Sequence, residues 1–111
     1  MIFDIQISEQ ADKDLRDIYE YIAFELLAPE NAARQLERLE NAIGKLGAMP
    51  EKYQRYEREP WFSRGLRVFS VDNFLVFYIP KMDAKIATVI RVMYGGRDVD
   101  KELERHTCYE E

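Results

Sequence analysis

Arginine side chains recur in the second half of this chain, among residues whose patterns otherwise indicate buried strands. Arg67, Tyr94 and Arg97 are the residues in this region that could carry chemistry. A guanidinium group grips a phosphate through paired donors and stays protonated, so the arginines suit charge stabilisation and cannot act as bases. A tyrosine with an ordinary pKa of about 10 is a poor base at neutral pH, although nearby arginines favour its phenolate. These three residues therefore include no side chain that acts readily as a general base at neutral pH.

Each of these three candidates also has a structural interpretation. Arg67 can pair with an acid of the predicted helices, and Tyr94 can pack on the sheet with its hydroxyl in water. Arg97 can form a salt bridge with Asp98 or Asp100. The cations that could support contact with a macromolecular target are Lys52, Arg55, Arg58, Arg64 and Arg91. The sequence leaves both interpretations open.

Composition predicts one packed domain over residues 1–111, because 47% of the residues are hydrophobic and 13% are aromatic. The net charge of −5 disfavours nucleic acid as a partner of the chain as a whole. That average hides a division. Residues 1–48 hold ten acids and five bases, residues 49–97 five acids and nine bases, and residues 98–111 six acids and two bases. The functional interpretation is a positive face between two acidic elements, and the alternative is uneven charge on a solvated surface.

The residue inventory excludes several classes of site. Cys108 is the only cysteine and His106 the only histidine, so we expect no intrachain disulfide and no metal site. We expect no cofactor, since there is no glycine-rich phosphate loop. No apolar run approaches the roughly 18 residues of a membrane span, and the N-terminus lacks the pattern of a signal peptide. The chain is expected to be cytoplasmic, without membrane contact.

Two amphipathic helices are predicted after a short strand. Residues 3–7 alternate as a half-buried strand does, and Ser8 can cap the first helix. Apolar residues recur at steps of three and four up to about residue 27 and again over residues 29–47, which predicts an antiparallel helical hairpin. Two carboxylate pairs at helical spacing are assigned to the solvent face: Asp14 with Asp17, and Glu37 with Glu40.

The second half of the chain predicts a long connection and then a meander of strands. Residues 48–64 mix aromatic residues, prolines and charges, as functional loops often do. Strands are predicted at residues 65–71, 74–79 and 85–94. Their connections are too short for crossovers, so the sheet should be mostly antiparallel. Alternation along the last strand turns Arg91 to an apolar face, which favours a structural role for it.

The order of elements predicts an α+β fold with the arrangement β-α-α-β-β-β. A short acidic helix is expected over residues 98–106 and a tail over residues 107–111, which makes residues 98–111 an acidic and partly mobile segment. The helical hairpin should pack on the sheet. We expect no further domain and no internal repeat.

The run GLRVFSVDNFLVFY at residues 65–78, followed by VIRVMYGGRD at residues 89–98, resembles the RelE/ParE superfamily of plasmid-stabilisation toxins. Those toxins carry a hairpin of similar pattern and a strand that ends in a glycine and an arginine. The resemblance covers nearly the whole chain and is most specific over residues 65–98. It implies the RelE/ParE fold and the function of a toxin in a type II toxin–antitoxin system.

The resemblance implies roles for the three candidate residues. Ribonucleases of the superfamily cleave mRNA in the ribosomal decoding site by driving the ribose 2′-hydroxyl onto the adjacent phosphate. Arg67 and Arg97 match arginines of that pattern, and Tyr94 stands where many relatives have histidine. Asp100 stands where many of the ribonucleases have a tyrosine, and no lysine-rich cluster precedes Arg67. The chain is therefore closer to the ParE-like branch, whose members poison DNA gyrase by binding.

Three hypotheses follow from the resemblance. The chain is a toxin that binds DNA gyrase, a ribosome-dependent mRNA endoribonuclease, or a degenerate member that only binds its antitoxin. The resemblance also implies a cognate antitoxin whose disordered segment folds along the toxin. Trp61 and Phe62 are the predicted antitoxin contacts, with packing on the chain's own core as the alternative. The sequence does not indicate the oligomeric state.

Overall fold

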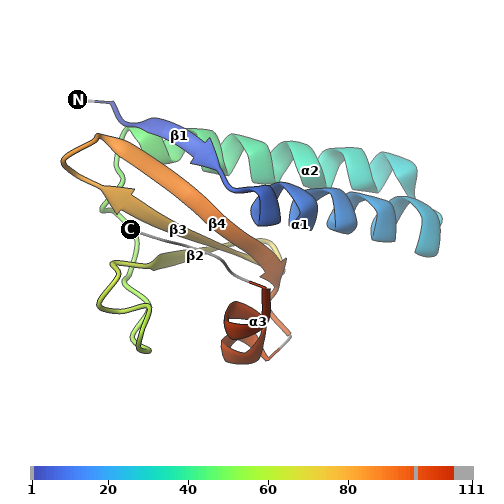
Figure 1. Ribbon diagram of the computed structural model, residues 1–111. Coiled ribbons are helices and arrows are strands. Elements are labelled where there is room, and N and C mark those ends of the chain that lie inside the picture. Colours follow the sequence, from blue (N-terminus) through green and yellow to red (C-terminus); the bar gives the residue numbers. More distant parts are fainter. Residues whose placement is uncertain (1, 97, 107–111) are drawn as a thin grey trace.

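A four-stranded sheet forms the centre of the protein in the computed structural model, which describes residues 2–96 and 98–106 (Figure 1). The strand order is β1-β4-β3-β2. β1 (Asp4–Ile7) pairs in parallel with β4 (Ile86–Tyr94). β3 (Phe74–Lys81) pairs antiparallel with both β4 and β2 (Arg67–Val71). The predicted α+β fold and the mostly antiparallel sheet are confirmed.

The helical hairpin follows the first strand, as predicted. Ser8 caps α1 (Glu9–Glu20) by accepting a hydrogen bond from the backbone N–H of Ala11. The helix continues as a π-helical turn, η1 (Tyr21–Glu25), and the chain then reverses at Leu27, whose φ is 53°. Pro29 opens α2 (Pro29–Gly44), where its missing N–H costs no helical hydrogen bond. A 3₁₀ turn, η2 (Lys45–Gly47), ends the hairpin.

The long connection between β1 and β4 explains why these two strands can lie parallel. Parallel strands need a crossover connection of a dozen or more residues, and the rest of the chain from α1 onward provides it. The short β2–β3 connection instead forms a tight turn, in which Asp72 takes a φ of 55°. The sequence predicted this turn and the three-stranded meander, but not the partner of the first strand.

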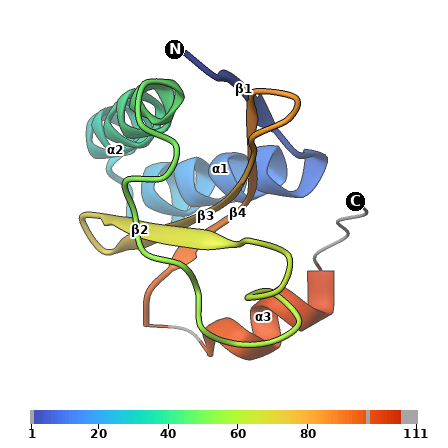
Figure 2. The ribbon, with the colours of Figure 1, turned by 90° about the vertical axis from the view of Figure 1, so that its left-hand side faces the viewer.

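The two faces of the sheet are covered by different kinds of structure (Figure 2). α1 and α2 cover one face, where Leu15, Leu39, Val76 and Val92 belong to one buried cluster. Residues 48–66 and α3 (Val99–His106) cover the other face. The buried cluster there comprises Trp61, Leu66, Phe77, Ile79, Ile90, Met93 and Leu103. β3 and β4 are thus buried on both sides, as their continuous apolar runs indicated.

The acidic segment near the C-terminus forms the predicted helix, α3. It is anchored in the core, because Leu103 is fully buried among the side chains of β3 and β4. The tail predicted at residues 107–111 lies outside the described residues. None of the helices within residues 2–96 and 98–106 is long and apolar enough to span a bilayer.

Candidate functional site

Arg67, the first residue of β2, is engaged by the chain's own backbone. Its Nη1 donates to the carbonyl oxygens of Tyr53 at 2.7 Å and of Glu51 at 3.3 Å. The Glu51 carboxylate lies 3.8 Å from Nη2, and the Arg67 side chain is only 18% exposed. Arg67 therefore fastens the loop of residues 48–66 to the edge strand, and the acid beside it comes from the loop and not from the helices.

Tyr94, the last residue of β4, lies away from Arg67. Its ring meets the ring of Phe74 edge-on at 6.1 Å, and half of its surface is exposed. Phe74 is the partner of Tyr94 in the sheet, and Tyr78 is the partner of Arg67. The two candidates are therefore about 13 Å apart along the strands and two strands apart across the sheet. Arg97 lies outside the described residues, so the structure does not place it.

Arg91 forms a buried ion pair at the centre of the molecule. Its Nε lies 2.7 Å and its Nη2 3.2 Å from the two carboxylate oxygens of Asp14, a bidentate contact. Its Nη1 donates to the backbone carbonyl of Glu102 in α3 at 2.7 Å. Only 3% of the arginine is exposed, which corrects the expectation that Arg91 contacts a target. Arg91 instead ties β4 to α1 and α3.

Asp14 also differs from the prediction, which assigned it to the solvent face of its helix. It is buried, and beyond Arg91 it accepts hydrogen bonds from the backbone N–H of Val92 and from the amide of Gln10. The signal was available in the sequence. Asp14 stands three residues after Ala11 and four before Ile18, so helical spacing places it on the apolar stripe. A carboxylate in that position requires a buried cation as partner.

The cations of the loop lie over aromatic rings or beside acids. Arg55 lies 4.0 Å from the ring centroid of Phe62 and donates to that residue's carbonyl oxygen. In the same loop, Arg64 lies 5.0 Å from the Trp61 centroid and Lys52 lies 5.3 Å from the Tyr53 centroid. Arg58 pairs with Asp100 of α3 at 3.5 Å. Target binding by these four cations stays a prediction.

Trp61 and Phe62, the predicted antitoxin contacts, have different surroundings. Trp61 is 5% exposed and packs with Leu66 and Phe77 in the cluster under α3. This burial corrects the expectation for Trp61, because its indole already caps the chain's own core. Phe62 is exposed beside Arg55, and antitoxin contact there stays a prediction.

A polar contact closes the loop over α3. The hydroxyl of Tyr56 donates to the carboxylate of Asp100, and the Tyr56 ring meets Phe77 edge-on. Burial, together with this hydrogen bond, raises the pKa of Tyr56 to about 12. A phenol that stays protonated suits a structural donor, so Tyr56 is not available as a base at neutral pH.

A groove of about 860 Å³ lies between the hairpin and the ends of β3 and β4. Ile18, Tyr21, Ile22 and Leu26 line it from the hairpin, and Phe74 and Tyr94 line it from the strands. Phe24 and Leu27, at the tip of the hairpin, are 67% and 83% exposed. Large apolar side chains seldom gather on a monomer surface without a partner, so this end of the molecule is a candidate interface.

A protein-family model described as the ParE toxin of type II toxin-antitoxin system, parDE, matches residues 5–99. The chain belongs to the ParE toxin family. The match includes the hairpin, the loop and all of β2, β3 and β4, so it extends well beyond the run that contains the arginines.

Solved structures agree with this ParE fold. The chromosomal ParDE system of P. aeruginosa contains a chain with a TM-score of 0.70 and 18% identity, covering 84% of this toxin and 96% of that chain. A chain of the toxin-antitoxin complex RelBE2 of Mycobacterium tuberculosis has a TM-score of 0.61 and 17% identity, and the match covers 85% of this toxin and 99% of that chain. A mutant of the E. coli toxin RelE in the free state has a TM-score of 0.62 and 14% identity, and the match covers 96% of this toxin and 99% of that chain. A search of curated proteins finds no match.

Proposed function

We propose that this ParE-family toxin arrests growth by binding DNA gyrase, not by cleaving RNA. The observation that supports the proposal is the separation of Arg67 from Tyr94. Cleavage by a ribose hydroxyl requires a base, an acid and a charge-stabilising group around one phosphate. Here the guanidinium of Arg67 is held by loop carbonyls, and Tyr94 packs on Phe74 two strands away. Inhibition by binding needs no such convergence.

The loop of residues 48–66 is the proposed contact with gyrase. It presents Lys52, Arg55, Arg58 and Arg64 on one irregular segment. Stacking of Arg55 and Arg64 on aromatic rings holds their planar groups in defined positions at the surface. Pre-positioned side chains lose less conformational entropy on binding, so a small number of them can supply specificity.

The test is a supercoiling assay with purified gyrase, relaxed plasmid and the antitoxin-free toxin. We expect the toxin to inhibit supercoiling and to trap linear DNA after protein is removed. The variant Lys52→Ala/Arg64→Ala should raise the inhibitory concentration by about tenfold, since it removes two interface cations. The matched control Lys13→Ala/Arg34→Ala removes the same charge from exposed positions of the hairpin. It should inhibit like the unchanged toxin.

Programmed ribosomes provide the competing measurement. mRNA with new 5′ ends in the decoding site, lost in Arg67→Ala, together with unaffected gyrase, would overturn the proposal in favour of the endoribonuclease. If the toxin acts on neither gyrase nor mRNA and its expression alone does not stop growth, the protein only binds its antitoxin. Gyrase inhibition with intact mRNA is the outcome that the proposal requires.

We also propose that a cognate antitoxin neutralises this toxin by covering the groove between the hairpin and the strand ends. The supporting observation is the exposed apolar surface of Tyr21, Phe24, Leu26 and Leu27, which continues into the groove. Burying such side chains on association contributes about 1.5–3 kcal/mol each before the cost of ordering the partner. Phe24 and Leu27 lie at the hairpin tip, so changing them should leave the core intact.

Growth rescue tests the antitoxin surface. Co-expression of the antitoxin from the same operon should restore growth to cells that produce the unchanged toxin. It should fail to restore growth with Phe24→Ser/Leu27→Ser, which should still arrest cells when expressed alone. Glu25→Ser, an exposed neighbour on η1, is the control and should still be neutralised. Full neutralisation of the double variant would contradict this placement of the antitoxin.

A further inference from the structure

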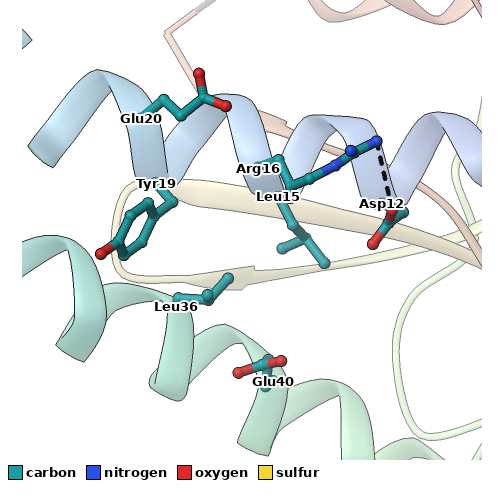
Figure 3. A pocket seen from close by; sticks show the side chains of 7 residues that line it. All are labelled: Asp12, Leu15, Arg16, Tyr19, Glu20, Leu36 and Glu40. Atoms are coloured by element: carbon teal, nitrogen blue, oxygen red, sulfur yellow. Dashed lines mark ion pairs between the residues drawn. The ribbon is translucent and has the colours of Figure 1, made fainter. Parts of the chain in front are cut away.

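A second cleft, separate from the groove and from the basic loop, lies between the two helices of the hairpin (Figure 3). Its volume is about 270 Å³. Leu15, Tyr19 and Leu36 supply an apolar floor where α1 and α2 meet. Acids from both helices stand around it: Asp12 and Glu20 from α1 and Glu40 from α2. The proposed gyrase and antitoxin contacts use none of these side chains.

The negative charge around this cleft is not compensated within the described part of the chain. Arg16, the cation of the rim, already pairs with Asp12 at 3.5 Å. The other hairpin arginines, Arg34 and Arg38, pair with acids away from the cleft. No salt bridge within residues 2–96 and 98–106 involves Glu20 or Glu40, and both are exposed. The rim thus holds three acids and one cation, which leaves two negative charges without a partner.

We propose that this cleft docks a basic amphipathic segment of another protein. Lys and Arg carry a positive head on an apolar stem, and such a side chain matches an apolar floor with an acidic rim. The apolar stems of the segment would lie on Tyr19 and Leu36, and different basic heads would reach Glu20 on α1 and Glu40 on α2, whose carboxylates do not point toward each other (Figure 3). The surrounding hairpin adds to the attraction, since residues 1–48 hold ten acids and five bases. This third surface is independent of the toxin's target.

The toxin's own loop is a poorer occupant than a foreign segment. Arg58 is already paired with Asp100, and Arg55 already donates to the carbonyl of Phe62. Using the loop cations of a second copy would break these contacts before forming new ones. A partner with uncommitted cations on one helix face avoids that cost.

Fluorescence anisotropy of a labelled, synthetic helix of leucine and lysine tests the proposal on the whole toxin. The double variant Glu20→Gln/Glu40→Gln should weaken binding by about fivefold to tenfold, because two charge contacts are lost. The control Glu9→Gln/Glu25→Gln removes the same charge from exposed hairpin positions outside the cleft. It should weaken binding less than twofold. In NMR spectra, the peptide should shift the signals of Leu15, Tyr19 and Leu36.

Several results would overturn the proposal. Equal weakening by both double variants would show general attraction to an acidic surface. Shifts confined to groove residues such as Ile22 and Phe74 would place the peptide elsewhere. Self-association of the toxin that is lost in Glu20→Gln/Glu40→Gln, measured by sedimentation, would assign the cleft to a second copy. Because the peptide assay contains no gyrase, its failure is distinguishable from failure of the proposed target.

Discussion

The two faces of the sheet are stabilised in different ways. The face under the hairpin is covered by two regular helices, and its cluster is almost entirely apolar. The face under α3 is covered by an irregular loop and one short helix, which depend on individual polar contacts. Tyr56 and Arg58 reach Asp100, and Arg67 donates to loop carbonyls. The first face follows from a repeating pattern, whereas the second depends on single residues placed by the tertiary structure.

One ion pair joins the two faces. Arg91 reaches Asp14 on the hairpin side and Glu102 on the α3 side, and all three belong to different elements. Because a buried charge without a partner is costly, this network should fix how the two layers sit on the sheet. Changes at its members should therefore affect both faces, whereas changes elsewhere should remain on one.

Removing the carboxylate of Asp14 should have the largest effect on stability. Asp14→Ala removes the bidentate partner of the buried Arg91 guanidinium, which keeps only its contacts with Glu102, and it also removes the acceptor of the Val92 N–H. We expect the free energy of unfolding to fall by about 3–5 kcal/mol. Urea denaturation followed by circular dichroism measures the change.

Asp17→Ala is the control, since Asp17 pairs with Lys13 at the surface of the same helix. It should cost at most about 0.5 kcal/mol. If the two variants were equally stable, Arg91 would have to find water or another acceptor, and the account of a network joining the faces would be wrong.

The sequence predicted the hairpin face much better than the other face. Steps of three and four among apolar residues fixed both helices, and the runs before and after Asp72 fixed β2 and β3. These patterns lie within single segments of the chain, so they can be recognised without knowledge of the tertiary fold. The pairing of β1 with β4 was not predicted, because it joins residues about 80 positions apart.

The candidate site was predicted less well for the same reason. The residue types at Arg67 and Arg91 were noticed, but their partners are a loop carbonyl and an acid assigned to solvent. The sequence left Trp61 with two interpretations, antitoxin contact or packing on the core, and its indole lies in the core. Residues 48–66 have no periodicity, so nothing local indicates which of their side chains turn inward. Contacts between distant elements decide that.

The next largest losses of stability should come from truncating one buried leucine on each face, and the two losses should differ. Leu39 of α2 and Leu103 of α3 are both fully buried. Leu39→Ala should cost about 3–4 kcal/mol, since the two long helices of the hairpin cannot move together to close the cavity. Leu103→Ala should cost less, about 2–3 kcal/mol, because short α3 can separate locally and relieve the defect.

Hydrogen exchange checks this difference. Leu103→Ala should raise exchange in α3 while the amides of α1 and α2 stay protected. Leu39→Ala should raise exchange throughout the sheet and the hairpin. Lys101→Ala, an exposed position on α3, is the control and should leave both patterns unchanged. Global loss of protection in Leu103→Ala would mean that α3 is as integral as the hairpin.

Alkaline pH should weaken both faces by a similar amount. Burial raises the pKa of Tyr78 to about 12, and its hydroxyl donates to the carbonyl of Pro50. Tyr56 has a pKa raised to about 12 by burial and by Asp100. A raised phenol pKa means that folding favours the protonated form. This stabilisation is complete below about pH 10 and is lost as the pH rises toward 12.

Phenylalanine variants measure each contribution through the slope of stability against pH in that interval. Tyr78→Phe and Tyr56→Phe should flatten the slope by similar amounts, because folding raises both phenol pKa values to about 12. Tyr21→Phe, at an exposed position, should leave the slope unchanged. An equal slope in all three variants would mean that other groups cause alkaline unfolding.

The smallest effects should come from the exposed ion pairs, one on each face. Arg38 lies 2.9 Å from Asp72 and links α2 to the β2–β3 turn, and Arg58 lies 3.5 Å from Asp100 and links the loop to α3. Arg38→Ala and Arg58→Ala should each lower the free energy of unfolding by less than about 0.5 kcal/mol. In 1 M NaCl, screening should make each variant as stable as the unchanged toxin. A larger loss in Arg58→Ala that persists in high salt would show that the loop needs this contact to stay closed. The second face would then depend on surface charge in a way that the hairpin face does not.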